Sequence, residues 1–250
     1  MREILIIYVL CFLYGSVSAQ HESVPAIIRA QSTLSGLERS LSDIAGGVTS
    51  GNITYGIPMP KGETIGDFYL DKNWNRISIL LYQKDILLEG YTARWDIKNS
   101  RLEIRAKNTE ETRALEIEKI KSMVWIDSST SIPRYFVNAK DYDFNGSGLP
   151  GMFEVLVEGK TTLFKRTTKY VQKANYNIAM DVGSRDDVII DKHEYYWATG
   201  GQVRELPRGR KMLGLFQDKG AEVKSYVKDK GLRLNKEEDI ILLFKYYNNT

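Results

Sequence analysis

The chain has 250 residues, a formal net charge of +3, two histidines and a single cysteine. Histidine is the usual general base and the commonest metal ligand, so its scarcity argues against serine-hydrolase triads and zinc sites. Charges of both signs are interspersed, so nothing in the composition requires nucleic acid as a partner.

The first nineteen residues have the pattern of an export signal. Met1-Arg2-Glu3 is followed by an apolar run from Ile4 to Tyr14 and then by the small-residue segment Gly15 to Ala19. A cationic start, a short apolar run and small residues at the exit are typical of a signal peptide. The run is shorter than the roughly 20 residues that a membrane-spanning helix needs. We therefore predict a signal peptide over residues 1–19 and no transmembrane span after its cleavage, with a retained anchor as the alternative.

The only cysteine, Cys11, lies inside this predicted signal. The mature chain would then have no disulfide, no thiol nucleophile and no thiolate metal site. Its stability would depend on a hydrophobic core, for which about 230 residues suffice as one large β domain or two smaller units. The expected location is the periplasm, the cell surface or the extracellular space.

Residues 20–65 are predicted to form a helix and a flexible arm. Apolar residues between Ile27 and Ile44 recur at helical spacing, and Gly46-Gly47 ends the pattern. The stretch that follows, as far as Gly62, is rich in Gly, Pro, Ser and Thr and offers little apolar area to bury.

From residue 66 to residue 206, strand-sized runs follow one another, separated by Asp, Asn, Lys and Gly. Leu102 to Arg105 alternates apolar and charged residues, as a half-buried strand does, and Lys98-Asn99-Ser100 is typical of a hairpin turn. The series predicts an antiparallel β-rich meander, or a partly closed barrel-like body around one core.

Residues 207–250 return to helical spacing, so the fold class is predicted to be α+β with a short C-terminal helical unit. Asn235 followed by Glu238 has the spacing of a helix-capping arrangement. We expect two or three short helices that cover an end or an open face of the sheet.

Five short motifs lie between residue 66 and the end of the chain: GDFYL at 66–70 with Trp74, YTARWDI at 91–97, LEI at 102–104, GMFEVLVEGK at 151–160 and YYN at 246–248. Together they resemble motifs of uncharacterised exported proteins of Bacteroidota. The resemblance covers roughly residues 66–250 and implies a location in the bacterial envelope. The family has no assigned activity, so the resemblance implies no catalytic residue.

One motif matches the start of a calcium loop, in which oxygen ligands at positions 1, 3 and 5 precede a glycine at position 6. The candidate ligands are Asp141, Asp143 and Asn145, followed by Gly146. Position 12, where such a loop has a bidentate glutamate, is Met152. An ordinary turn is the alternative, and no other cofactor is expected.

Aromatic side chains supply the candidate ligand-binding residues, because their flat rings can bind sugars or peptides. The candidates are Tyr195, Trp197, Trp74 and Trp95. Alternation along a strand places Tyr195 and Trp197 on one face and Tyr196 on the other. Ordinary core and edge packing of aromatics in strands is the alternative.

Charged residues supply further candidates. Acids near predicted strand ends could form the opposed pair of a glycosidase, although solvated turns explain them as well: Asp127, Asp181, Asp186, Asp187 and Asp191. A basic run could face anionic lipid or polysaccharide: Lys160, Lys165, Arg166, Lys169 and Lys173. Positive charge at a predicted helix start hints at an anionic contact: Arg208, Arg210 and Lys211.

No nucleophile motif, metal-ligand set or phosphate-binding loop is recognisable in the sequence. These observations favour an exported envelope protein that is a non-enzymatic binding or structural module, with an envelope protein or a polysaccharide as its partner. The alternative function is a carboxylate-dependent hydrolase that acts on envelope glycans.

Overall fold

The computed structural model describes residues 62–106, 109, 111–177, 180 and 182–250. The predicted signal peptide, the predicted helix between residues 27 and 44 and almost all of the predicted arm lie outside the described residues. The chain divides into two units, one of Met1–Glu63 with Ala174–Asp186 and one of Thr64–Lys173 with Asp187–Thr250. The second unit is described below. Among the described residues, no helix combines the length and the apolar character needed to cross a membrane.

This unit is built on one sheet of 11 strands. In chain order they are β1 (Thr64–Ile65), β2 (Asn75–Leu81), β3 (Leu87–Asp96), β4 (Arg101–Ala106), β5 (Thr112–Glu116), β6 (Ile120–Ile126), β7 (Pro133–Asn138), β8 (Met152–Val157), β9 (Thr162–Gln172), β10 (Asp187–Thr199) and β11 (Gln202–Glu205). Short 3-10 helices lie between some of them: η1 (Gln83–Asp85), η2 (Ile117–Lys119) and η3 (Ala139–Asp141).

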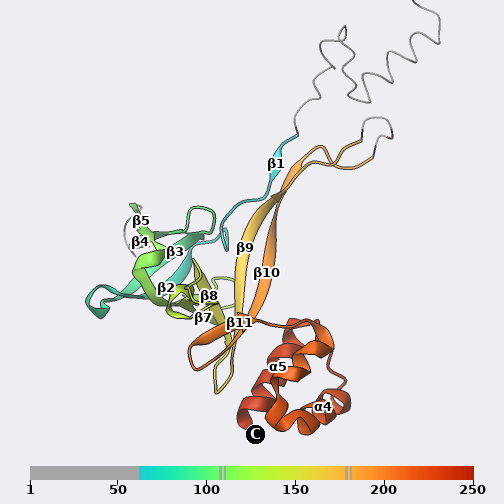
Figure 1. The fold of residues 1–250 in the computed structure, drawn as a ribbon. Coiled ribbons are helices and arrows are strands. Elements are labelled where there is room, and N and C mark those ends of the chain that lie inside the picture. Colours follow the sequence, from blue (N-terminus) through green and yellow to red (C-terminus); the bar gives the residue numbers. More distant parts are fainter. Residues whose placement is uncertain (1–61, 107–108, 110, 178–179, 181) are drawn as a thin grey trace, which may run out of the picture. The chain divides into compact units, whose positions relative to one another are not determined.

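The strand order is β1-β10-β9-β8-β7-β6-β2-β3-β4-β5, with β11 also paired to β10 (Figure 1). Every pairing is antiparallel except that of β1 with β10. Within the described part of the chain no ladder joins β1 to β5, so the sheet is open. The predicted α+β class is confirmed, as an antiparallel meander that does not close.

Alternation along the strands builds the first core, which lies among β2 to β7 and includes Met152 of β8. On β6, Met123 and Trp125 are buried while Lys121 is exposed. On β4, the predicted alternating strand, Leu102 is buried and Ile104 packs against the same core. The predicted turn at 98–100 joins β3 to β4.

The long hairpin of β9 and β10 carries a second core at its base. The two strands pair continuously from Val188↔Gln172 to Ala198↔Thr162. Phe153 of β8 stacks on Phe164 of β9 with ring centroids 5.0 Å apart, and Tyr196 of β10 contacts Phe153 at 5.1 Å. These rings attach the start of β9 and the end of β10 to β8.

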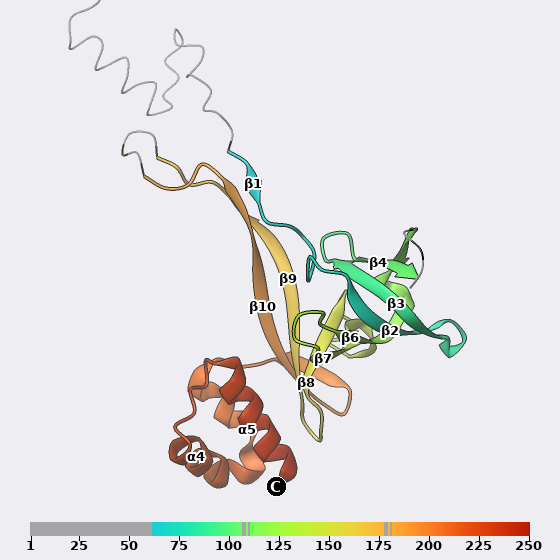
Figure 2. The same ribbon diagram turned by 180° about the vertical axis from the view of Figure 1, so that it is seen from behind.

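The helical unit comprises η4 (Gly209–Leu215), η5 (Gln217–Lys219), α4 (Gly220–Asp229) and α5 (Glu237–Asn249). Its core includes Phe216, Val223 and Phe244, and it continues into Val157 of β8 and Leu163 of β9. The unit therefore packs against one end of the β8–β9 part of the sheet (Figure 2). The capping prediction at Asn235 was wrong, because α5 begins at Glu237 after Lys236 and has no side-chain cap.

Candidate functional site

The four aromatic candidates lie in two separate parts of the larger unit, which comprises Thr64–Lys173 and Asp187–Thr250. Trp95 on β3 is 5% exposed in the first core and packs edge-on against Phe136 at 5.7 Å. Trp74, just before β2, is half-buried, with Arg105 Cζ 3.8 Å and Arg94 Cζ 4.6 Å from its ring centroid. Trp74 is therefore stacked with the unit's own cations.

Tyr195 and Trp197 lie together on β10, beside the helical unit. Trp197 packs against the core of that unit, and Tyr195 Oη donates a hydrogen bond of 2.5 Å to Glu237 Oε2 in α5. The structure thus brings this pair together and separates it from Trp74 and Trp95. Tyr195 also borders a cavity, which makes its surroundings the first candidate site.

The three candidate calcium ligands occupy a turn region with partners of their own. Asp141 accepts a hydrogen bond of 2.6 Å from Tyr82 Oη, and Asp143 accepts one of 2.7 Å from the backbone N–H of Gly146. Asn145 and Gly146 have φ values of 53° and 89°, which fit a type I′ hairpin turn. No group of three or more His, Cys, Asp or Glu side chains suited to a metal ion is found in the described part of the chain. Calcium binding stays a prediction.

The basic run along β9 is neutralised by acids. Its ion pairs, from 2.8 to 3.7 Å, are Lys160–Asp218, Lys165–Glu154, Lys165–Glu237, Arg166–Glu194, Lys169–Asp191 and Lys173–Asp187. The run therefore gives no uncompensated positive face. The same pairs engage Asp187 and Asp191, while Asp186 accepts from the backbone N–H of Glu63 and Asp181 lies outside the described residues.

The sequence did not indicate the most prominent feature of β10, which is an open edge. β1 pairs with β10 only at Asp187 and Val188, and β11 pairs with it only from Tyr196 to Thr199. Between these two ladders, β10 has β9 on one side, and no described strand pairs with its other side (Figure 1).

The described chain leaves β10 at each end of this edge. Gly66 directly follows β1 with a φ of 101°, a backbone conformation that favours glycine, and an added Cβ there would come within 3.2 Å of Ile189 of β10. Beyond Gly66 the chain runs beside the end of β3 instead, where Phe68 O accepts a hydrogen bond of 2.9 Å from the N–H of Ile97. At the other end β11 stops at Glu205, and the last contact is Leu206 N to Tyr195 O at 2.8 Å. The chain then enters η4 at Gly209, so the ladder ends there.

The ladder fixes which backbone groups face the open edge. In an antiparallel ladder, the N–H and C=O of one residue point to one neighbouring strand, and those of the next residue point to the other. Because Tyr195 O bonds to Leu206, the groups of His193 and Asp191 also face the edge, while those of Lys192 and Glu194 bond to β9. The edge thus presents a repeating pair of donors and acceptors.

A cavity of about 330 Å³ lies beside this edge. Its apolar wall comes from the helical unit through Met212, Leu234 and Ile240, and its polar wall includes His193 of β10 and Arg208. An extended backbone at the open edge would have side chains next to this space. The cavity volume falls in the range of about 300–1,000 Å³ that is typical of ligand pockets.

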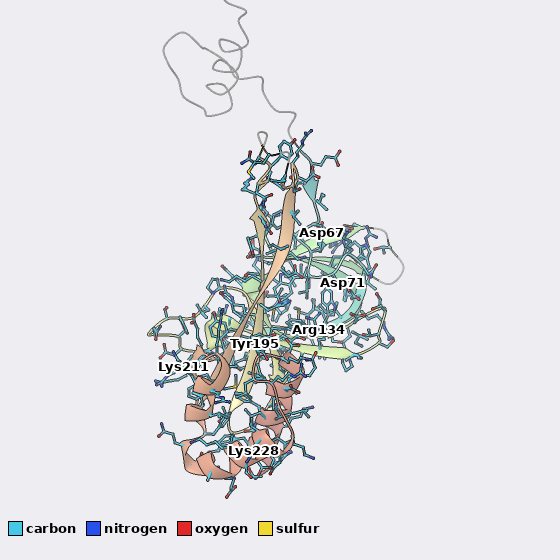
Figure 3. The ribbon with its side chains drawn as sticks, turned by 90° about the vertical axis from the view of Figure 1, so that its right-hand side faces the viewer. Asp67, Asp71, Arg134, Tyr195, Lys211 and Lys228 are labelled. Atoms are coloured by element: carbon cyan, nitrogen blue, oxygen red, sulfur yellow. The ribbon has the colours of Figure 1, made fainter. Side chains whose placement is uncertain are left out.

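A network of charges holds the sheet and α5 together next to the cavity. Figure 3 labels two of its members, Arg134 and Tyr195. Arg134 donates two hydrogen bonds to Glu154, of 2.7 and 2.8 Å. Lys165 lies 3.4 Å from Glu154 and 3.0 Å from Glu237, which also accepts from Tyr195. The network joins four strands to the first turn of α5, so the cavity lies between elements that are fixed to each other.

The network also sets the protonation of its members. Burial raises the pKa of Glu154, but the hydrogen bonds and charge of Arg134, with Lys165, outweigh burial and leave the pKa below its ordinary value. Burial and the Glu237 carboxylate raise the pKa of Tyr195. The network therefore holds an ionised carboxylate and a neutral phenol at neutral pH.

Sequence reasoning missed Arg134, Glu154, Lys165 and Glu237 as a set, because they come from segments far apart in the chain. Two residues singled out from the sequence line the cavity at the β10 edge: Tyr195 from the aromatic candidates and Arg208 from the cations at the predicted helix start. A comparison with known proteins finds no matching family model, no matching curated protein and no matching solved structure.

Proposed function

We propose that this chain is an exported envelope protein and that its described part is a non-enzymatic module which binds an extended peptide segment of another envelope protein along the open edge of β10. The observation that carries the proposal is the edge at Asp191 and His193 beside the cavity, with which no strand of the described residues pairs. Peptides that add as a strand use main-chain hydrogen bonds for affinity and neighbouring pockets for side-chain specificity.

The chain itself supports this use of the edge. Both β1 and β11 are short segments that pair with β10 on either side of the gap. An extended peptide rises about 3.3 Å per residue, so a segment of roughly four to six residues would fit between them. Its donors and acceptors would meet those of His193 and Asp191.

The side chains of the open edge add selectivity. Asp191, Lys192 and His193 are exposed and polar, and charges on an edge strand discourage indiscriminate pairing. The cavity wall of Met212, Leu234 and Ile240 offers a place for an apolar side chain of the right partner. Backbone pairing and an apolar anchor together favour a peptide over a bare glycan chain.

The alternative function, a carboxylate-dependent hydrolase, lacks such support. A glycosidase needs one carboxyl group with a raised pKa as its general acid. Glu194 lines the cavity, and its hydrogen bond from Lys192 holds its pKa below the ordinary value. Glu154, in the adjoining network, has a lowered pKa as well.

Site-specific photo-crosslinking in the native host tests the proposal. A benzophenone amino acid at Glu205, which lines the cavity, should crosslink to a peptide of one envelope protein, identified by mass spectrometry. The same group at the exposed Glu89 of β3 is the control. The adduct at position 205 should disappear when His193→Pro removes an edge N–H. Adducts with glycan alone, or adducts that persist with His193→Pro, would contradict the proposal.

Export is tested separately. Amino-terminal sequencing of the protein from its native host should begin at Gln20. Recovery of the intact, uncleaved chain from the cytosol would contradict an envelope location and leave the β10 edge to be judged by the crosslinks.

A further inference from the structure

A second cavity, of about 720 Å³, adjoins the one beside β10. The two share Gly209, Leu234 and Asn235 in their linings, so they are neighbours. The second lies within the helical unit, between η4, α4 and the segment that leads to α5.

The lining of this second cavity is basic on an apolar base. Arg210, Lys224 and Lys228 supply its charges, and no Asp or Glu is among its described lining residues. Its apolar residues include Leu213 and Val227. A ligand with acidic groups and some apolar surface fits this combination.

The cations of the cavity are not neutralised by the described part of the chain. The ion pairs of the helical unit use Lys160 and Lys165 of the sheet side, with Asp218 and Glu237, and none includes Arg210, Lys224 or Lys228. These three side chains are exposed. The basic run along β9, in contrast, is paired throughout.

The acids of the helical unit are largely committed elsewhere. Asp218 accepts from Tyr247 and Lys160, and Asp239 accepts from the backbone N–H of Arg233. Residues 207–250 contain ten Lys and Arg against six Asp and Glu, so this segment carries more than the whole chain's net charge of +3. Figure 3 shows Lys211 and Lys228 on this unit.

Resting on the proposed function, we infer that the bound segment is acidic at one end. Its extended part pairs with β10, and its acidic residues continue into the second cavity against Arg210, Lys224 and Lys228. Since the lining of the first cavity has charges of both signs, from Lys192 and Arg208 and from Glu194 and Glu205, it sets no such preference. Because positive charge dominates only in the second cavity, the acidic end of the segment lies there and its extended part lies along β10.

Peptide probes with exchangeable tails test the inference on the purified full chain. Each fluorescent probe has six alternating Val and Thr residues followed by four Glu, four Gln or four Lys. By fluorescence anisotropy at low salt, we expect the Glu tail to bind at least about tenfold more tightly than the Lys tail, because charge complementarity adds affinity that salt screens. The preference should shrink as the salt concentration rises.

Matched variants assign this preference to the second cavity. The double variant Lys224→Ser with Lys228→Ser should abolish the preference for the Glu tail. The control pair Lys230→Ser with Lys245→Ser removes two exposed lysines of the same unit that do not line the cavity, and it should preserve the preference.

The outcomes separate the inference from the function on which it rests. Equal binding of the three tails, with all binding lost in His193→Pro, would overturn the acidic segment and keep the β10 edge. Binding that His193→Pro leaves unchanged, or no binding by any probe, would overturn both. If vesicles of phosphatidylglycerol bind through Lys224 and Lys228 and the Glu-tailed probe does not displace them, the ligand is an anionic membrane and the inference is wrong.

Discussion

Tyr195 and Glu237 are joined by a hydrogen bond of 2.5 Å between the phenol Oη and the carboxylate Oε2, which links strand β10 to the first turn of helix α5. Glu237 also accepts from Lys165 Nζ at 3.0 and 3.1 Å. A single acidic residue thus accepts hydrogen bonds from two neighbouring strands. These bonds position the helical unit so that it forms one wall of the cavity.

Replacing Tyr195 by Phe should lower the free energy of unfolding by about 1–2 kcal/mol, since a hydrogen bond to a charged acceptor is lost while the ring stays. The lower end is expected because the Glu237 side chain is 30% exposed and water can replace part of the contact. Urea unfolding provides the measurement. Tyr170→Phe is the control, because Tyr170 is 48% exposed on β9, and it should change the free energy by less than about 0.5 kcal/mol. Equal effects of the two substitutions would contradict the role of Tyr195.

Glu154→Gln should destabilise the fold by roughly 2–4 kcal/mol at neutral pH, because it leaves the partly buried Arg134 without its charged partner. The side chain of Glu154 is 8% exposed, so water compensates little. The control is Glu116→Gln, whose pair with Lys119 is 68% and 64% exposed and should contribute at most about 0.5 kcal/mol.

The effect of Glu154→Gln should depend on pH in a defined direction. The folded chain holds the pKa of Glu154 below its ordinary value of 4.5, so the stabilisation is complete above pH 4.5. It is lost as the pH falls from 4.5 through the lowered value. The gap between the unfolding free energies of wild type and variant should therefore narrow in acid. A constant gap from pH 7 down to pH 3 would contradict the ion pair.

Asp127 should titrate with a pKa of about 2, mainly because the Ser129 hydroxyl and then the backbone N–H groups of Thr130 and Ser129 donate to its carboxylate. Ser129→Ala should raise this pKa toward the ordinary value of 3.8, and Thr130→Ala should raise it less. Carbon-detected NMR titration measures both. A wild-type value already near 3.8 would show that the turn is not formed as described.

The local parts of the fold were predictable because they depend on neighbouring residues. The alternation of Leu102 to Arg105 and the turn at Lys98 to Ser100 follow from strand period and turn chemistry. The return to helical spacing after residue 206 likewise marks the helical unit. The wrong capping prediction at Asn235 shows the limit of such patterns. The spacing of Asn235 and Glu238 does not determine the residue at which α5 begins.

The site could not be predicted, because it depends on pairings between distant segments. Thr64 pairs with Asp187, and β2 pairs with β6 as well as with β3. The periodicity of the sequence does not reveal either of these long-range pairings. The open edge exists only because two strands stop on either side of it. Likewise Lys165 and Arg166 formed part of a basic run in the sequence, while the acids that neutralise them come from β8, β10 and α5.

A proline scan of β10 tests the open edge by stability alone, without any ligand. His193→Pro and Asp191→Pro remove N–H groups that face the edge, so each should cost no more than about 1 kcal/mol, as proline is tolerated where the N–H points to solvent. Lys192→Pro and Glu194→Pro remove N–H groups that bond to β9 and should each cost about 3 kcal/mol or more. Urea unfolding of the four variants gives the comparison. If Lys192→Pro and Glu194→Pro cost less than the other two, the N–H groups of Lys192 and Glu194 face the edge instead. If all four variants cost about 3 kcal/mol or more, a strand covers β10 at these positions.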